Sequence, residues 1–156
     1  MLYASLAVVF VLDRLTKLAV TEQIDHGCSV SVIDNILYFN HVRNTGAAFG
    51  LLSDYIHFLI FATLVVIGIT VWIYHFSPYG EFLNPFGMGL YLGGAVGNLI
   101  DRIQWGFVVD FIDFRIWPVF NVADAAIVVG VFVLIIHFYR CEPWLTRQSS
   151  DLEEVN

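Results

Sequence analysis

The stretch YIHFLIFATLVVIGITVWIYHF, residues 55–76, contains no Asp, Glu, Lys or Arg. A helix needs about 20 residues to cross the hydrocarbon core of a bilayer, so this stretch predicts a membrane-spanning helix. Three more apolar segments surround it in the sequence. They are residues 1–20, 82–101 and 117–139. The pattern predicts a mainly α protein, an integral membrane four-helix bundle.

The overall composition agrees with a membrane protein. Hydrophobic residues make up 58% of the 156 residues and charged residues 13%, and the mean hydropathy is +0.75. Soluble domains carry about twice that charged fraction. The net charge is −7 and no basic run occurs, so no nucleic acid partner is expected. The length fits one membrane domain, residues 1–156.

The segments between the spans predict a small cap on one side of the membrane. Residues 21–54 contain the β-prone pieces CSVSVI and ILYFNHV, and residues 103–116 lie on the same side. Four spans leave both chain ends on the other side, where the chain ends in a tail, residues 140–156, whose acidic last part DLEEVN, residues 151–156, is expected to be disordered. Cys28 and Cys141 then lie on opposite sides and cannot pair, and neither belongs to a metal-ligand spacing.

The distribution of basic residues bears on which side of the membrane the chain ends occupy. Five of the seven basic residues fall on the cap side, which by the positive-inside rule places the chain ends outside the cell. Arg14, Arg102 and Arg115 neighbour aspartates, and pairing within the fold would weaken that inference.

Polar residues with no ordinary place in a membrane cluster at the cap-side face. Asn98 and Arg102 are four residues apart, so they share one helix face, as do Asn121 and Asp124 at a spacing of three. An ionisable residue such as Asp124 inside a span is costly and by default indicates a functional site. The cluster consists of Asp13, Asn44, Asn98, Asp101, Arg102, Asp110, Asp113, Asn121 and Asp124.

Two neighbouring aspartates, Asp110 and Asp124, are suited to peptide hydrolysis. Close carboxyls share one proton, because both cannot ionise cheaply. The ionised one can take a proton from an attacking water, and the protonated one can hydrogen-bond the scissile carbonyl. This chemistry needs no metal and no cofactor. The motifs G-x-S-x-G and H-E-x-x-H do not occur in the sequence.

Three other interpretations remain open. The aspartates could form a structural clamp, with Asp110 and Asp124 paired to Arg102 and Arg14. They could instead form the aspartate relay of a proton- or ion-translocating membrane protein, although a relay needs a path through the membrane and these residues gather at one face. The chain could also be an assembly subunit held by its polar residues.

Five blocks together resemble a known family. They are LDRLTK at 12–17, RNTGAAFGLL at 43–52, GGAVGNLIDR at 93–102, GFVVDFIDF at 106–114 and FNVADAAI at 120–127. In order and spacing they resemble lipoprotein signal peptidase, or signal peptidase II, a bacterial membrane aspartic peptidase family. The resemblance extends from about Leu12 to Tyr139, and Arg14 departs mildly from it because Gln is common at that position.

The resemblance implies an aspartic endopeptidase that removes the signal peptide of prolipoproteins, cutting before a diacylglyceryl-modified cysteine. It implies Asp110 and Asp124 as the catalytic pair. It assigns supporting or substrate-binding roles to Asn44, Gly46, Asn98, Arg102, Asn121, Asp13 and Lys17.

The resemblance also implies a place in the cell. It puts the enzyme in the bacterial cytoplasmic (inner) membrane as a multi-pass protein. Its active site and β-containing extracytoplasmic cap would face the periplasmic or outer side, with the tail in the cytoplasm, opposite to the charge count. Expected partners are membrane lipid and globomycin-type inhibitors, and the expected state is a monomer without cofactor.

Overall fold

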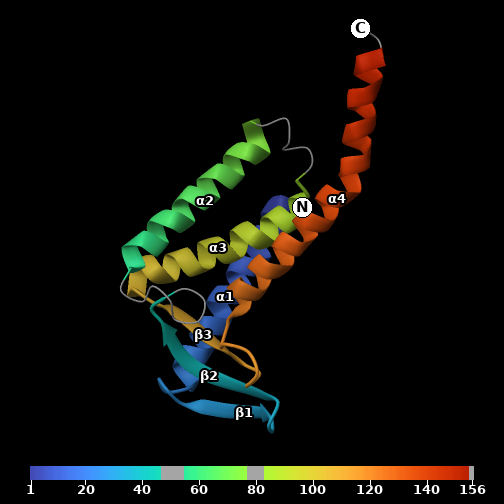
Figure 1. Ribbon diagram of the computed structural model, residues 1–156. Coiled ribbons are helices and arrows are strands. Elements are labelled where there is room, and N and C mark those ends of the chain that lie inside the picture. The colour runs from blue at the N-terminus through green and yellow to red at the C-terminus, as the bar shows by residue number, and fades with distance from the viewer. Residues whose placement is uncertain (47–54, 77–82, 155–156) are drawn as a thin grey trace.

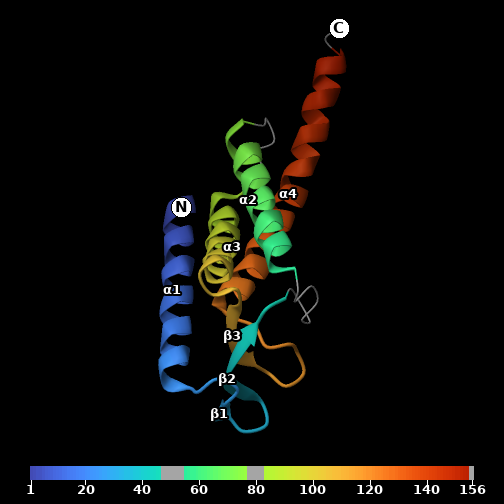
Figure 2. The same cartoon turned by 90° about the vertical axis from the view of Figure 1, so that its left-hand side faces the viewer.

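Four helices and a small sheet make up the computed structural model, which describes residues 1–46, 55–76 and 83–154. The helices are α1 Leu2–Gln23, α2 Ile56–Phe76, α3 Pro85–Trp105 and α4 Val122–Glu154. The strands are β1 Ser29–Ile33, β2 Leu37–Asn44 and β3 Val108–Asp113. The sheet lies at one end of the helices and both termini lie toward the other end (Figures 1 and 2). The predicted mainly α fold with a small β region is thus confirmed.

Two of the four helices have the length and apolarity of a membrane span. Within the described residues, these are α2 and the part Val122–Arg140 of α4, with mean hydropathies of 2.5 and 2.3. In α1 and α3, charged residues or glycines interrupt the apolar sequence. The second half of α1 carries Asp13, Arg14, Lys17 and Glu22, and α3 contains five glycines.

Helix α3 is the central helix, packed between α1 and α4 (Figure 2). Asn84 begins it, because the Asn84 side chain accepts hydrogen bonds from the backbone N–H groups of Phe86 and Gly87 at 3.0 and 3.1 Å. Gly106 ends it in the left-handed region, at φ 73°, and its N–H donates to the Arg102 carbonyl. By contrast, α2 has no buried residue.

The glycines of α3 explain this close packing. A Cβ built on Gly94 would overlap the Ala123 carbonyl oxygen of α4 and lie 2.9 Å from Cγ1 of Ile127. On other sides of α3, Gly89 and Gly93 make similar approaches to α1. Glycine therefore lets two neighbouring backbones approach α3 at once, as small residues do in membrane helix pairs.

The sheet is antiparallel with strand order β1-β2-β3. The two pieces expected to be β-prone form β1 and β2, joined by a turn in which Asn35 has a φ of 63°. The third strand was not expected. It comes from the segment before α4, and Val42 of β2 lies opposite Asp110. The sheet therefore joins both parts of the predicted cap.

Several expected boundaries differ from the structure. Helix α4 begins at Val122 and not at 117, because Phe120 first bridges back to Ile112 of β3. Helix α3 begins at Pro85, after its Asn84 cap, and not at 82, while α1 continues to Gln23. The acidic segment 151–156 was expected to be disordered, but α4 continues through it to Glu154, and residues 155–156 lie outside the described residues.

The close α3–α4 approach leads to a stability prediction. We expect Gly94→Ala to lower the free energy of unfolding by about 1–3 kcal/mol, because the new methyl group would push against the Ala123 carbonyl. The matched control is Gly68→Ala in α2, where a Cβ would meet nothing within 4 Å. The control should unfold at the wild-type temperature or slightly above it. Thermal unfolding in detergent measures both, and equal effects would contradict the packing argument.

Candidate active site

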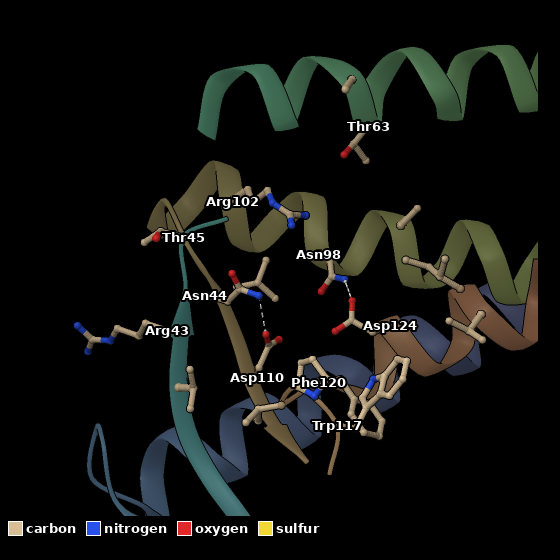
Figure 3. Close-up of a pocket in the computed structure, with 18 of the residues that line it drawn as sticks. Arg43, Asn44, Thr45, Thr63, Asn98, Arg102, Asp110, Trp117, Phe120 and Asp124 are labelled. Carbon is tan, nitrogen blue, oxygen red and sulfur yellow. Dashed lines mark hydrogen bonds between the residues drawn. The ribbon is translucent and has the colours of Figure 1, made fainter. Parts of the chain in front are cut away.

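A cavity of about 830 Å³ lies between α2, α3, α4 and the ends of β2 and β3 (Figure 3). Asp110 and Asp124 both line it, as do Asn44, Asn98 and Arg102. The structure thus brings together five of the residues that the sequence singled out. Toward the helices the wall becomes apolar, with Ala62, Val66, Ala95, Ile127 and Val128.

Strand pairing positions Asp110. The residue lies in the middle of β3 and is 2% exposed. Asn44, at the end of the neighbouring β2, donates from Nδ2 to Oδ2 of Asp110 at 2.8 Å. The register of β2 against β3 therefore decides where this carboxylate points.

A helix cap positions Asp124. Asn121 precedes α4 and accepts at Oδ1 from the Asp124 backbone N–H at 2.9 Å, while its own N–H donates to Oδ2 of Asp124 at 3.2 Å. This reciprocal pair is a capping box. Asn121 and Asp124 were expected on one face of a helix, but Asn121 lies outside α4 and caps it. From α3, Asn98 donates from Nδ2 to Oδ1 of Asp124 at 2.7 Å.

The Asn121 side chain also connects the two carboxylates. Its Nδ2 donates to Oδ1 of Asp110 at 2.7 Å and lies 3.2 Å from Oδ1 of Asn98. Each of the four oxygens of Asp110 and Asp124 thus accepts an N–H from an amide group. Within the described residues, neither carboxylate forms an ion pair.

The basic residues near the site pair with other aspartates. Lys17 lies 2.9 Å from Asp13 and 2.8 Å from Asp101, and Arg14 pairs with the same two carboxylates. This network fastens α1 to α3. The hypothesis of a clamp through Asp110 and Asp124 is therefore wrong for the described residues, because other aspartates form the clamp.

Asp13 and Lys17 are not among the described residues that line the cavity, but they contact those that do. Lys17 donates from Nζ to Oδ1 of Asn98 at 3.0 Å, and only 5% of its side chain is exposed. Asp13 accepts the backbone N–H of Ala123 at 3.3 Å. Lys17 thus reaches Asp124 through Asn98, and Asp13 contacts Ala123, the residue before Asp124.

Gly46 and Arg102 meet at the cap side of the cavity. The Gly46 N–H donates to Oδ1 of Asn44 at 3.0 Å, and its carbonyl accepts from Nη2 of Arg102 at 3.3 Å. The rest of the block that begins there, residues 47–52, lies outside the described residues. Nε of Arg102 is buried and has no hydrogen-bond acceptor among the described residues, so this guanidinium can still bind an oxygen.

Burial raises the pKa of Asp110 from its ordinary value of 3.8 to about 7, and the negative charge of Asp124 acts in the same direction. Hydrogen bonds from Asn44 and Asn121 oppose this rise in pKa and do not cancel it. Near neutral pH the site therefore carries a proton that an exposed aspartate would have lost. Such a group suits general acid–base chemistry.

Sequence reasoning missed several residues of the cavity wall. Trp117 and Phe120 come from the segment that was expected to be helical, and Thr63 comes from α2. A polar residue in a charge-free span could have drawn attention to Thr63, but its hydroxyl donates to the Leu59 carbonyl of its own helix at 2.7 Å. No pattern in the sequence distinguished the two aromatic residues. In the described part of the chain, no three His, Cys, Asp or Glu side chains could hold a metal ion.

Comparison with known proteins agrees with this geometry. The family model described as signal peptidase (SPase) II matches residues 5–140. The chain belongs to the signal peptidase II family. A lipoprotein signal peptidase from Halothermothrix orenii is 42% identical over 142 residues, covering 91% of this chain and 97% of its own. Another, from Nostoc punctiforme, is 40% identical over 141 residues, covering 89% of each chain.

Solved structures show the same fold. A bacterial membrane enzyme determined by the in meso method at 2.3 Å resolution superposes with a TM-score of 0.79 and 33% sequence identity. The match covers 89% of this chain and 87% of that one. A second such enzyme, at 1.9 Å resolution, gives a TM-score of 0.72 and 35% identity, covering 85% and 88%. The resemblance of this chain to signal peptidase II is thus confirmed.

The raised pKa of Asp110 leads to a prediction of pH-dependent stability. The folded-state pKa of about 7 exceeds the ordinary 3.8, so the folded protein binds the extra proton between these values. This contribution to stability is full at low pH and is lost as the pH rises through about 7. We expect Asp110→Asn to lose less stability than wild type when the pH rises from about 5 to 8.

Thermal unfolding in detergent across that pH range measures the difference. Asp34→Asn, which changes an exposed carboxylate in the turn between β1 and β2, serves as the control and should follow wild type. Parallel curves for wild type and Asp110→Asn would contradict the proton uptake by Asp110.

Proposed function

We propose that Asp110 and Asp124 are the catalytic carboxylates of this signal peptidase II. Membership of the family makes the chain a peptidase that removes signal peptides from prolipoproteins. The observation that supports the pair is that both carboxylates line one cavity and are held by amides and not by cations. The family does not favour the alternative of an ion-translocating protein with an aspartate relay.

In the proposed mechanism the pair holds one proton. The ionised carboxylate takes a proton from water as the water oxygen attacks the carbonyl carbon of the scissile peptide bond. The protonated carboxyl donates a hydrogen bond to the carbonyl oxygen, where negative charge develops. When the tetrahedral intermediate collapses, the C–N bond breaks and a proton passes from the pair to the leaving amine. The reaction consumes one water and needs no metal or cofactor.

Amide side chains orient this pair. We assign Asn44, Asn98 and Asn121 to holding the two carboxyls, because each donates to one of them. Arg102 lines the cavity and donates to the Gly46 carbonyl, and its Nε–H, which has no acceptor among the described residues, is suited to a substrate carbonyl. Lys17 and Asp13 do not line the cavity and support the pair through other residues. Lys17 fixes the amide of Asn98, and Asp13 helps to hold the start of α4.

The shape of the cavity fits a lipid-bearing substrate. Its apolar wall continues from the carboxylates along α2, α3 and α4, where a diacylglyceryl group on the cysteine could lie beside the scissile bond. We propose cleavage immediately before that cysteine. Globomycin-type cyclic peptides are proposed to inhibit by occupying the same cavity.

We further propose four membrane spans in the bacterial inner membrane. The outward faces of α1 and α2 support this, because they expose large apolar side chains that water would not favour. They include Val8, Val11, Leu15, Phe58, Phe61 and Trp72. In this arrangement the sheet and the active site lie at the periplasmic face, both termini lie in the cytoplasm, and the chain acts as a monomer.

A cleavage assay tests the catalytic pair. We expect Asp110→Asn and Asp124→Asn each to lower kcat/KM by at least about a thousandfold, because removing one member of a catalytic unit removes most of its effect. The substrate is a diacylglyceryl-modified prolipoprotein in detergent, and the product is checked for cleavage before the lipid-bearing cysteine.

The matched control is Asp113→Asn. Asp113 is another buried aspartate of β3, but it contacts Asn40 and Arg115 and does not line the cavity. We expect near wild-type cleavage from the folded control. If folded Asp110→Asn or Asp124→Asn still cuts at the wild-type rate, the aspartates are not catalytic. A folded wild type that never cuts but supports proton flux in proteoliposomes would favour the translocator.

Cysteine labelling tests the orientation. Cys28 is exposed near the start of β1, on the cap side. We expect a membrane-impermeant maleimide to modify the Cys141→Ser variant, which keeps Cys28, in intact spheroplasts. The Cys28→Ser variant, which keeps Cys141, should react only after permeabilisation. The reverse pattern would overturn the proposed orientation and favour the one from the charge count.

A further inference from the structure

A second cavity of about 480 Å³ lies behind the sheet, between the ends of α1 and α3. Strand alternation separates it from the catalytic pair. Asn44 and Asp110 face the first cavity, whereas His41 and Val109 line the second. Of the groups that face only this second cavity, the proposed peptidase mechanism uses Lys17 alone, as a support for Asn98.

Arg43 is the cation of the second cavity that forms no ion pair with a described carboxylate. Its side chain points away from Asp110 and Asp124 (Figure 3) and also lines the second cavity. Its guanidinium carbon lies 4.9 Å from the centre of the Phe107 ring. No ion pair of Arg43 occurs among the described residues.

The other charges of the cavity nearly cancel. Arg14 and Lys17 line it together with Asp101, and Asp13 lies behind them, so two cations meet two carboxylates. Arg43 therefore gives the site an excess of positive charge. The cavity thus offers net positive charge to a ligand, and Arg43 supplies it.

The rim of the cavity has the character of a membrane interface. Trp105, the last residue of α3, is 62% exposed, and Leu18 of α1 is 54% exposed. Tryptophan is enriched where the hydrocarbon core meets the headgroups. From Leu18 the outward face of α1 continues with exposed Leu15 and Val11. A ligand bound here would therefore meet cations at one end and an apolar helix face at the other.

We propose that this cavity binds the phosphate headgroup of an anionic phospholipid, whose acyl chains lie along the outward face of α1. Arg43 would contact the phosphate oxygens, and Gln104 and Thr21 border the same space. A lipid is favoured over a soluble anion because the apolar face of α1 adjoins the cations. The bound lipid would fasten the back of the sheet to the bilayer.

The association of spin-labelled lipids with the full chain in phosphatidylcholine vesicles tests this site. We expect wild type to retain labelled phosphatidylglycerol in preference to labelled phosphatidylcholine. Arg43→Gln should lower that preference about fivefold, as expected for one basic residue near a membrane surface. The control Arg115→Gln removes the same charge from the cap side but outside the cavity, where Arg115 lies 3.8 Å above the Tyr38 ring. It should retain most of the preference.

A second variant tests the site without changing Arg43, in case Arg43→Gln misfolds. Gln104→Glu places a negative charge on an exposed residue of the cavity rim, and it should also lower the preference. Equal losses in the two arginine variants would indicate diffuse surface charge and overturn the site. An unchanged preference in both Arg43→Gln and Gln104→Glu would overturn it as well. Displacement of the labelled lipid by low-millimolar inorganic phosphate would show a soluble-anion site and refute the lipid. Because the assay involves no cleavage, its outcome is independent of the catalytic proposal.

Discussion

The buried side-chain amide of Asn121 is the group on which the arrangement of the site depends. It caps α4 through Asp124, donates to Asp110 of β3 and lies within hydrogen-bond distance of Asn98 in α3. The residue is 0% exposed, so solvent could not satisfy its side-chain amide instead. The start of a helix, the position of a strand and the placement of two carboxylates are therefore fixed by the same few hydrogen bonds.

Among the described residues, no cation forms an ion pair with Asp110 or Asp124, although Arg102 lines the same cavity. Lys17 donates a hydrogen bond to Asn98 and not to Asp110 or Asp124, and it forms ion pairs with Asp13 and Asp101. A direct contact between a cation and Asp110 would hold that carboxyl ionised and lower its pKa. With amide donors in place of cations, burial dominates and the pKa of Asp110 is about 7. The network that fastens α1 to α3 thus supports the site and leaves its proton in place.

Most helices and the convergence of the polar residues could be predicted from the sequence, because apolar length and helical spacing are local properties. The third strand could not, since VVDFID adjoins an apolar run and only pairing with β2 makes it a strand. Likewise, the unbroken run from 116 onward concealed the loop that ends at Asn121. Spacing placed Arg14 near the aspartates but could not choose Asp101 over Asp124 as its partner, because that choice depends on how α1 and α3 pack.

The absence of any buried residue in α2 has a consequence for the cavity that this helix borders. Packing inside the chain holds α1, α3 and α4, but α2 presents mainly apolar side chains to its surroundings. In the proposed membrane arrangement, lipid acyl chains contact α2, as the rest of the protein also does. The α2 wall of the cavity therefore depends on the bilayer, through its lateral pressure and hydrocarbon thickness, whereas Asp110 and Asp124 are held by hydrogen bonds within the protein.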